Sequence, residues 1–208
     1  MPFLGPCSGA SNAALPHPIT VTQRVLFERG SQAPEGLIFE PDFLTIAEEN
    51  ELIDVIRALP FGEVRMHGVV AKRRVAHFGL RYAFTSHQLS PASEIPREFD
   101  AIRKRAANLA AVEPHAFSEV LVTEYPPGAG IGWHRDAPPF GIIAGISLAA
   151  DCTMRFRKGI AGQRDTSAVN LPRRSLYVLA GTARTEWQHS IAPIAELRYS
   201  ITFRTLKQ

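Results

Sequence analysis

The stretch FSEVLVTEY, Phe117–Tyr125, marks the point where the spacing of apolar residues changes from a helical period to a period of two. A period of two is typical of a β-strand with one buried face. Four further stretches have the same character, with turn residues between them: GIIAGISLA (141–149), CTMRFRK (152–158), SLYVLAG (175–181) and LRYSITFRTL (197–206). Many short strands in succession predict a sandwich or barrel such as the jelly roll.

Helical patterns precede these strands. Thr45 and Glu48 form a capping box ahead of a helix with one apolar face. A second helix is predicted over residues 96–112. Helices packed on antiparallel strands give an α+β fold class. Residues 1–35, rich in Pro, Gly, Ser and Ala, are predicted to be a flexible N-terminal arm, and residues 36–208 one folded domain.

The composition is that of an ordinary globular chain. Its 208 residues suit one domain, and 45% are hydrophobic and 21% charged. No apolar run approaches the roughly 20 residues that a membrane span needs, and the N-terminus lacks the pattern of a secretory signal. The two cysteines, Cys7 and Cys152, cannot form a disulfide framework and are expected to be free thiols. A cytoplasmic protein with no membrane partner is therefore expected.

The charge gives a mild indication of an anionic partner. The formal net charge is +3 and the pI is about 9.1. Basic residues cluster at four places: 72–74, 103–105, 155–158 and 173–174. Solvated surface is the alternative explanation for each cluster.

The segment GWHRDAPPFG, Gly132–Gly141, holds a histidine and an aspartate two residues apart, His134 and Asp136. His189 lies just before the last predicted strand, and a late strand of a rolled sheet can return beside an early one. Two imidazoles and one carboxylate on one side of a metal form the facial triad of non-heme Fe(II) oxygenases. A zinc site with an open position is the metallic alternative. A chance H-x-D pair with a structural histidine is the non-metallic one.

The last predicted strand carries polar side chains on one face. In RYSITFR, Arg198, Ser200, Thr202 and Arg204 alternate with Tyr, Ile and Phe. Two arginines at the ends of such a stripe fit a small dicarboxylate, because the planar guanidinium binds a carboxylate through two hydrogen bonds. An edge strand with its polar face in water would show the same pattern.

Together these motifs resemble the AlkB family of Fe(II)- and 2-oxoglutarate-dependent dioxygenases. The resemblance rests on EYPPGAGIGWHRD (124–136), on the later His189 and on RYSITFR (198–204). GLIFEPDFLTIAEENELIDVIRALPF (36–61) and KRRVAHFGLRYAF (72–84) resemble the family's N-terminal region. The similarity covers roughly residues 36–206.

The resemblance implies a double-stranded β-helix, or jelly-roll, core and a full set of site residues. Fe(II) would be bound by His134, Asp136 and His189. Contacts to the co-substrate 2-oxoglutarate would come from Arg198, Arg204, Tyr125, Thr123 and Ser200. Arg198 would bind the distal carboxylate, Tyr125 would donate a hydrogen bond to the co-substrate, and Arg204 would lie near its other end. Thr123 and Ser200 stand where asparagine is frequent in the family, and their side chains have a shorter reach.

The implied reaction uses O2 and 2-oxoglutarate to dealkylate N-alkylated bases in DNA or RNA, releasing formaldehyde, succinate and CO2. Phe78 and Tyr82 are the candidates for stacking on the base, with packing in the sheet as the alternative. Arg73, Arg74 and Arg81 are candidate phosphate contacts.

Three alternatives remain open at this point. Residues 137–139, Ala-Pro-Pro, stand where several DNA-repair members have an acid, so base choice is open. The same chemistry could act on transfer RNA modifications or on protein, or the fold could serve as a non-catalytic binding module. A monomer is expected.

Overall fold

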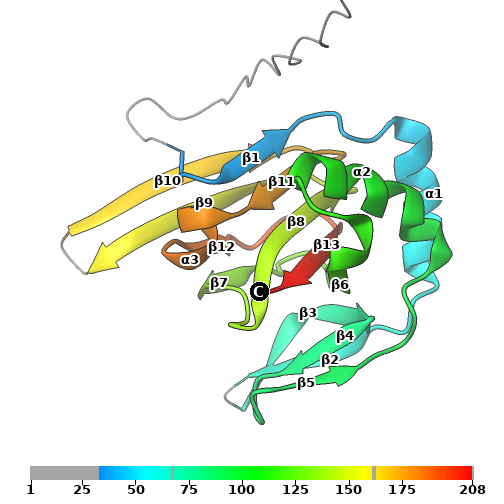
Figure 1. Cartoon of the computed structure of the whole chain (residues 1–208), viewed down its shortest axis with the longest axis horizontal. Coiled ribbons are helices and arrows are strands. Elements are labelled where there is room, and N and C mark those ends of the chain that lie inside the picture. The colour runs from blue at the N-terminus through cyan, green and yellow to red at the C-terminus, as the bar shows by residue number, and fades with distance from the viewer. Residues whose placement is uncertain (1–32, 67, 161–162, 208) are drawn as a thin grey trace, which may run out of the picture.

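The computed structural model describes residues 33–66, 68–160 and 163–207 (Figure 1). Apart from residues 33–35, the predicted N-terminal arm lies outside the described residues. Within the described residues, no helix has the length and apolar character needed to cross a membrane.

Two antiparallel sheets form the body of the fold. The larger has the strand order β1-β11-β8-β13-β6-β3-β2, and the smaller has the order β10-β9-β12-β7. The strands of the larger sheet are β1 (Leu37–Glu40), β2 (Gly62–Met66), β3 (Val69–Phe78), β6 (Phe117–Tyr125), β8 (Phe140–Leu148), β11 (Leu176–Leu179) and β13 (Arg198–Leu206). Those of the smaller sheet are β7 (Ile131–His134), β9 (Cys152–Ile160), β10 (Gln163–Leu171) and β12 (Gln188–Ile191). The predicted α+β class with a jelly-roll core is confirmed.

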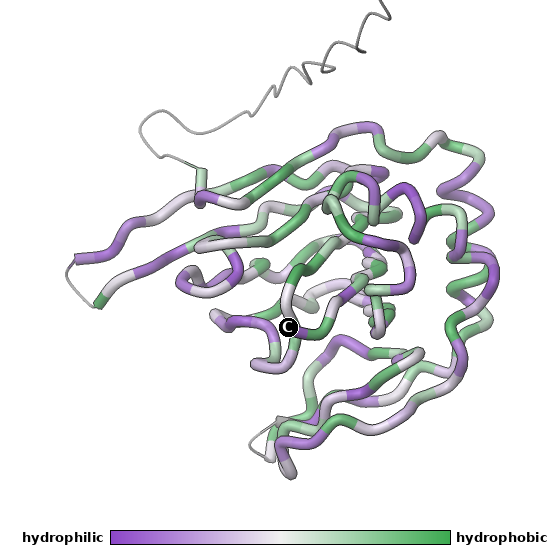
Figure 2. The backbone as a smooth tube through the Cα atoms, in the orientation of Figure 1, coloured by the Kyte–Doolittle hydropathy of each residue, from purple (hydrophilic) through white to green (hydrophobic). Residues whose placement is uncertain are grey.

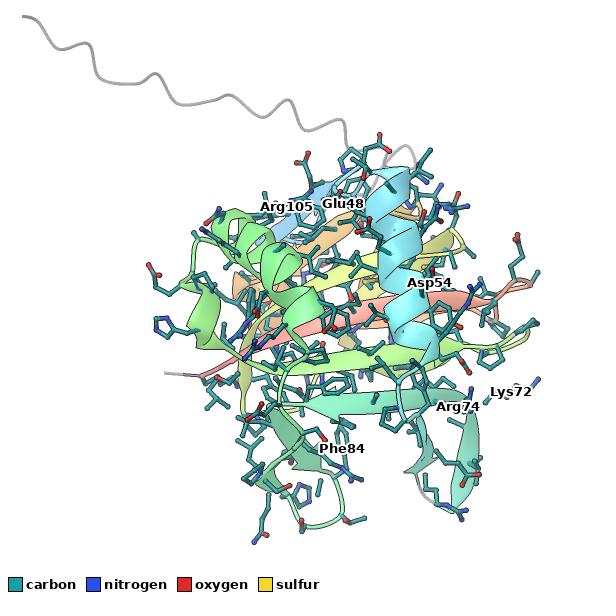
Figure 3. The ribbon with its side chains drawn as sticks, turned by 90° about the vertical axis from the view of Figure 1, so that its right-hand side faces the viewer. Glu48, Asp54, Lys72, Arg74, Phe84 and Arg105 are labelled. Atoms are coloured by element: carbon teal, nitrogen blue, oxygen red, sulfur yellow. The ribbon has the colours of Figure 1, made fainter. Side chains whose placement is uncertain are left out.

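Helices cover one face of the larger sheet, as Figure 3 shows from the side. They are α1 (Ile46–Arg57) and α2 (Asp100–Ala110), with 3-10 turns at Arg97–Phe99 and Pro114–Ala116 and a short α3 (Gly181–Thr185) elsewhere. The predicted capping box starts α1: the Thr45 hydroxyl accepts from the Glu48 amide at 3.2 Å, and the Glu48 carboxylate accepts from the Thr45 amide at 2.8 Å. Arg105 of α2 reaches Glu48, which joins the two helices (Figure 3).

The apolar side chains form two cores. One lies between the helices and the larger sheet and includes Ile56, Phe99 and Phe203. The other lies on the opposite face of that sheet, against the smaller sheet, and includes Phe140, Phe156 and Tyr177 at its centre. The apolar parts of the chain in Figure 2 follow the central strands accordingly.

The structure adds strands that the sequence patterns did not predict. A turn was expected over residues 158–165; in the described part of this stretch, residues 158–160 of β9 pair with residues 163–165 of β10. β10 lacks the apolar alternation of the other strands, because most of its residues are exposed and only Ser167, Val169 and Leu171 face the core. A further hairpin of β4 (Leu80–Ala83) and β5 (Gln88–Pro91) forms its own two-stranded sheet.

Candidate metal and co-substrate site

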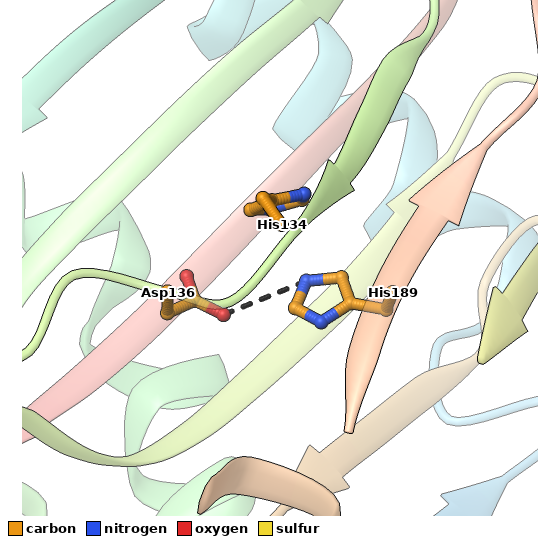
Figure 4. A group of neighbouring side chains, drawn as sticks. All are labelled: His134, Asp136 and His189. Carbon is orange, nitrogen blue, oxygen red and sulfur yellow. Dashed lines mark ion pairs between the residues drawn. The ribbon is translucent and has the colours of Figure 1, made fainter. Parts of the chain in front are cut away.

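Neighbouring strands of the smaller sheet bring the predicted metal ligands together (Figure 4). His134 ends β7 and pairs with His189 of β12. Asp136 follows His134 by two residues, and its Oδ2 lies 3.6 Å from Nε2 of His189. One ligand atom from each of the three side chains lies within 4.8 Å of the others. The donor set is two nitrogens and one oxygen, which suits Fe(II).

The protonation states also favour a metal. Burial lowers the pKa of both imidazoles, that of His189 to about 3, so both rings are neutral near pH 7. Burial alone would raise the pKa of Asp136, but the Arg204 guanidinium and the histidines hold it well below its usual range. A metal ion needs neutral imidazoles and an ionised carboxylate. The residues present therefore fit a divalent metal without a change of charge.

A buried chain of charged groups holds Asp136 in place. Arg204 donates from Nη2 to Oδ1 of Asp136 at 2.5 Å and from Nη1 to Glu119 at 2.9 Å. Glu119 is fully buried in β6 and also lies 2.9 Å from Nδ1 of His77. Arg204 was expected near one end of 2-oxoglutarate; in the structure it binds the predicted metal ligand Asp136 and a carboxylate that sequence reasoning missed. The signal that could have identified Glu119 in the sequence is the presence of an acidic residue within an apolar strand pattern.

The Arg198 guanidinium is buried without a counter-ion. Its side chain is 1% exposed, and Nε donates to the Ser147 hydroxyl at 3.1 Å. Nη1 has no hydrogen-bond partner, and no carboxylate pairs with Arg198 among the residues that the structure describes. Its guanidinium carbon lies 5.1 Å from the Tyr125 ring centroid. A buried, unpaired cation is costly, so this position fits an anionic ligand such as a 2-oxoglutarate carboxylate.

Tyr125, Thr123 and Ser200 lie near Arg198 on the same sheet, whereas Arg204 lies further along β13. Arg198 lies opposite Tyr125 in β6, and Ser200 lies opposite Thr123. Ser200 also faces Ser147 on its other side, in β8. Thr123 and Ser200 are both buried. The structure thus places all five predicted co-substrate residues on the paired strands β6 and β13, where they line one face.

Tyr177 is a further residue of this site that sequence reasoning missed. It lies opposite Gly145, and a Cβ at Gly145 would lie 2.3 Å from Cζ of Tyr177. The ring therefore reaches across β8 toward Thr202, which pairs with Gly145 from β13. Burial, and then the Asp136 carboxylate, raise the pKa of Tyr177, so its hydroxyl keeps its proton and can donate a hydrogen bond.

The predicted stacking residues lie in different cores. Phe78 is 5% exposed and packs edge-on against Phe99 beneath the helices. The prediction that Phe78 stacks on a base is therefore wrong, and the alternative of sheet packing holds. Tyr82 is buried in the other core, in the same cluster as Ala137, which follows Asp136. The exposed side chain is Phe84, 56% accessible, whose ring lies edge-on to Tyr82 at 5.0 Å (Figure 3).

The predicted phosphate contacts differ in availability. Arg74 donates twice to Glu124, at 2.8 and 3.0 Å, and lies over the Phe61 ring. Its guanidinium is therefore already engaged within the fold. Arg81 is exposed on β4. Lys72 extends from β3 to the loop after β6, where its Nζ would lie 3.1 Å from a Cβ at Gly128.

Comparison with known proteins agrees with this geometry. Residues 36–204 match the family described as the 2OG-Fe(II) oxygenase superfamily. The chain is 29% identical over 181 residues to the Arabidopsis thaliana "Alkylated DNA repair protein ALKBH8 homolog", covering 75% of this chain and 50% of that protein. It is 27% identical over 168 residues to the mouse "tRNA (carboxymethyluridine(34)-5-O)-methyltransferase ALKBH8", covering 77% of this chain and 24% of that protein. The chain thus spans half or less of these relatives.

Solved structures show the same fold. OsALKBH1 superposes with a TM-score of 0.68 at 16% identity, covering 86% of this chain and 99% of that one. A Pseudomonas putida prolyl-4-hydroxylase superposes with a TM-score of 0.58 at 15% identity, covering 83% and 93%. The family match, the relatives and the geometry of the site lead to one assignment. The chain belongs to the 2OG-Fe(II) oxygenase superfamily as an AlkB-type dioxygenase that uses Fe(II), 2-oxoglutarate and O2.

Proposed function

We propose that this dioxygenase removes alkyl groups from the nitrogens of nucleic-acid bases, with release of formaldehyde, succinate and CO2. The observation that carries the proposal is the character of the border of the metal site. Tyr82 of β4 lies in the same core cluster as Ala137, next to the predicted ligand Asp136, and its ring contacts the exposed ring of Phe84. Lys72 of β3 lies beside Gly128, in the loop between β6 and β7. Arg73 lies close enough to lower the pKa of His134. Aromatic and cationic groups together suit a base on its phosphate backbone.

The roles of the site residues follow from their contacts. His134, Asp136 and His189 would hold the metal, and Arg204 engages Oδ1 of Asp136, which leaves Oδ2 on the side of His189. Arg198 would bind one carboxylate of 2-oxoglutarate. When bound, Fe(II) with 2-oxoglutarate and O2 supplies the oxidant for an N-alkyl carbon.

Two tyrosines can replace the hydrogen bonds that the short side chains of Thr123 and Ser200 would not make to 2-oxoglutarate. Thr123 and Ser200 have a shorter reach than asparagine. Tyr177 can supply a hydrogen bond from the opposite side, because Gly145 leaves room for its ring. Tyr125 supplies another from β6.

The remaining chemistry takes place on the substrate. Hydroxylation of the N-alkyl carbon gives a hemiaminal. Its C–N bond then breaks, the bonding electron pair stays on the ring nitrogen, and the hydroxyl proton is lost to solvent. A base that N1- or N3-methylation had made positively charged thereby becomes neutral. Formaldehyde leaves and the unmodified base remains. The chain has to hold the target C–H bond at the metal and exclude water, which the buried aromatic Tyr82 and the apolar Ala137 favour.

A second candidate function is oxidation of a transfer RNA modification. A relative is named for transfer RNA, and residues 137–139 supply no acid that would select a base. The same chemistry on protein remains the weaker alternative, because the aromatic and cationic border favours nucleic acid. We further propose that residues 36–208 act as a single catalytic domain.

A panel of substrates tests the proposal. The protein is first loaded with Fe(II) and 2-oxoglutarate in the absence of oxygen. It then receives O2 together with one substrate of the panel. The substrates are DNA and RNA oligonucleotides that carry one N1-methyladenine or N3-methylcytosine, transfer RNA, and a methylated peptide. The mass of the substrate and released formaldehyde are followed, with His134→Ala as control. The proposal is supported if an oligonucleotide loses one methyl group with the unmodified protein but not with the His134→Ala variant. Succinate formation that leaves every oligonucleotide unchanged would overturn it, and oxidation of transfer RNA alone would support the second candidate.

A further inference from the structure

We propose that the outer face of the smaller sheet is a second nucleic-acid site, which binds the phosphate backbone of the substrate strand beyond the target base. This inference rests on the proposed function. We call this surface the arginine face and define it by Trp133, Arg155, Arg157 and Arg164. The long β9–β10 hairpin that carries most of it runs out at one side of the molecule (Figure 1).

Strand alternation places these side chains on one surface. In β9, Met154 and Phe156 are buried in the core, so Arg155 and Arg157 between and after them point outward. In β10, Ser167 and Val169 face the core. Arg164 therefore points to the outer side, as does Thr166, which pairs with Arg157.

A tryptophan and a glutamine hold the arginines in place. The guanidinium carbon of Arg157 lies 4.3 Å from the Trp133 ring centroid, and that of Arg155 lies 5.5 Å from it. Arg157 also donates from Nε to the Gln188 side chain at 2.8 Å. This bond leaves its two terminal nitrogens to bind a ligand. Because the side chains are already ordered, binding a phosphate costs less conformational entropy.

The arginine face carries positive charge that the fold does not neutralise. No carboxylate pairs with Arg155, Arg157 or Arg164 among the described residues. The neighbouring Lys158 does have acidic partners: its Nζ lies 4.0 Å from Oδ2 of Asp165 and 3.8 Å from Oε2 of Glu186. Arg164 also lies close enough to Arg157 to lower its pKa, after the effect of burial. Three arginines with no acid between them suit a polyanion.

The position of the face suits the strand that carries the target base. Trp133 and Gln188 directly precede the ligands His134 and His189 in the chain, so they lie on the reverse side of the same strands. β7, which carries Trp133, is the edge strand of its sheet. A nucleic-acid strand with one base at the metal can pass this edge and continue across the arginine face. Arginine in particular binds phosphate through two hydrogen bonds.

The salt dependence of binding tests the inference. Fluorescence anisotropy would measure the affinity of labelled single strands of about 5 and about 20 nucleotides, since a single-strand site covers on the order of 4–16 nucleotides. The double variant Arg155→Gln/Arg157→Gln is compared with Arg57→Gln, an exposed arginine of α1. The expected result for the longer strand is a slope of log K against log salt whose magnitude falls by about 1.4, because each of the two lost contacts to a single-strand phosphate removes about 0.7. The shorter strand and the Arg57 variant should behave like the unmodified protein.

An unchanged slope for the longer strand in the double variant would overturn the inference. Turnover of the short methylated oligonucleotide separates this outcome from failure of the proposed function, because that reaction does not need the arginine face. Both arginines point away from the core, so the unfolding midpoint of the double variant should match that of the unmodified protein.

Discussion

Replacing Arg198 by methionine should stabilise the protein in the absence of 2-oxoglutarate while abolishing its response to this co-substrate. The guanidinium is 1% exposed, has one hydrogen bond to Ser147, and leaves Nη1 without a partner. A methionine fills a similar volume without a buried charge. Replacing buried charges by well-packed apolar side chains is neutral or stabilising by about 1–4 kcal/mol.

The cost of the same change to ligand binding is larger. Loss of a buried charged contact to a carboxylate costs about 2–5 kcal/mol. Since about 1.4 kcal/mol corresponds to a factor of ten, 2-oxoglutarate should bind about 30-fold to 4,000-fold more weakly. The unmodified protein at a 2-oxoglutarate concentration of about 100 Kd gains about 2.7 kcal/mol, which raises Tm by about 5–10 °C in a chain of this size.

Thermal unfolding with and without 2-oxoglutarate measures both effects. Mn(II) in place of Fe(II) keeps the site loaded without turnover, since oxygen and nitrogen donors bind it as well. Arg57→Met, at an exposed arginine paired with Asp54, is the matched control and should retain the full ligand-induced shift. An Arg198→Met variant that unfolds at a lower temperature than the unmodified protein, yet still gains stability from 2-oxoglutarate, would refute the reasoning.

Three further predictions concern the groups around the metal. In the metal-free protein, burial lowers the pKa of His189 to about 3, whereas the pKa in the unfolded chain is about 6.5. Between these two pH values the unfolded chain binds more protons than the folded one. The contribution of His189 to the free energy of unfolding is therefore fully present above about pH 6.5 and is lost as the pH falls toward 3. At pH 5 the loss is about 2 kcal/mol, and His189→Gln should flatten this dependence in urea unfolding; equal slopes in both proteins would contradict it. Glu119→Gln should cost about 3–5 kcal/mol of stability and weaken Mn(II) binding, because Arg204 loses one of its carboxylates; unchanged Mn(II) affinity would show that Glu119 does not position Asp136. Tyr177→Phe should weaken 2-oxoglutarate binding about five- to tenfold, the worth of one hydrogen bond, and calorimetry that finds equal affinity would remove Tyr177 from the pocket.

The metal triad could be predicted from the sequence because its geometry is local. Two of the ligands are separated by one residue, and the third lies on the strand that pairs with theirs. The polar face of the last strand was predictable for a similar reason, since alternation alone puts Arg198 and Arg204 on one side. The sequence therefore contained the chemistry of the site.

The partners of these residues depend on strand register, which the sequence does not show. Glu119 meets Arg204 because β6 and β13 pair in a register that places the two residues opposite each other. Tyr177 meets Gly145 through the pairing of β11 with β8. Each contact joins residues that are far apart in the chain, and a shift by one residue would reverse the faces.

The misassignment of Phe78 has a local cause. A continuous strand would place Phe78 and Tyr82 on the same face, because they are separated by four residues. Gly79 interrupts the strand with a φ of 73°, and a Cβ there would lie 2.3 Å from the Ser118 carbonyl oxygen. The chain turns at this glycine, so Phe78 enters the core beneath the helices and Tyr82 the core next to the metal site. A glycine within an apolar strand pattern is the signal of such a break.

Conversion of 2-oxoglutarate to succinate tests the central claim, that the His134, Asp136 and His189 cluster is the oxygenase centre. Succinate would be measured in the unmodified protein and in His189→Gln, each with equal Fe(II), 2-oxoglutarate and O2 and with a methylated oligonucleotide. Iron content would be measured after gel filtration. The account predicts about one iron per chain and oxygen-dependent succinate in the unmodified protein, and loss of both in the variant. Succinate formation at an undiminished rate in His189→Gln would place the reaction elsewhere in the chain and contradict the account.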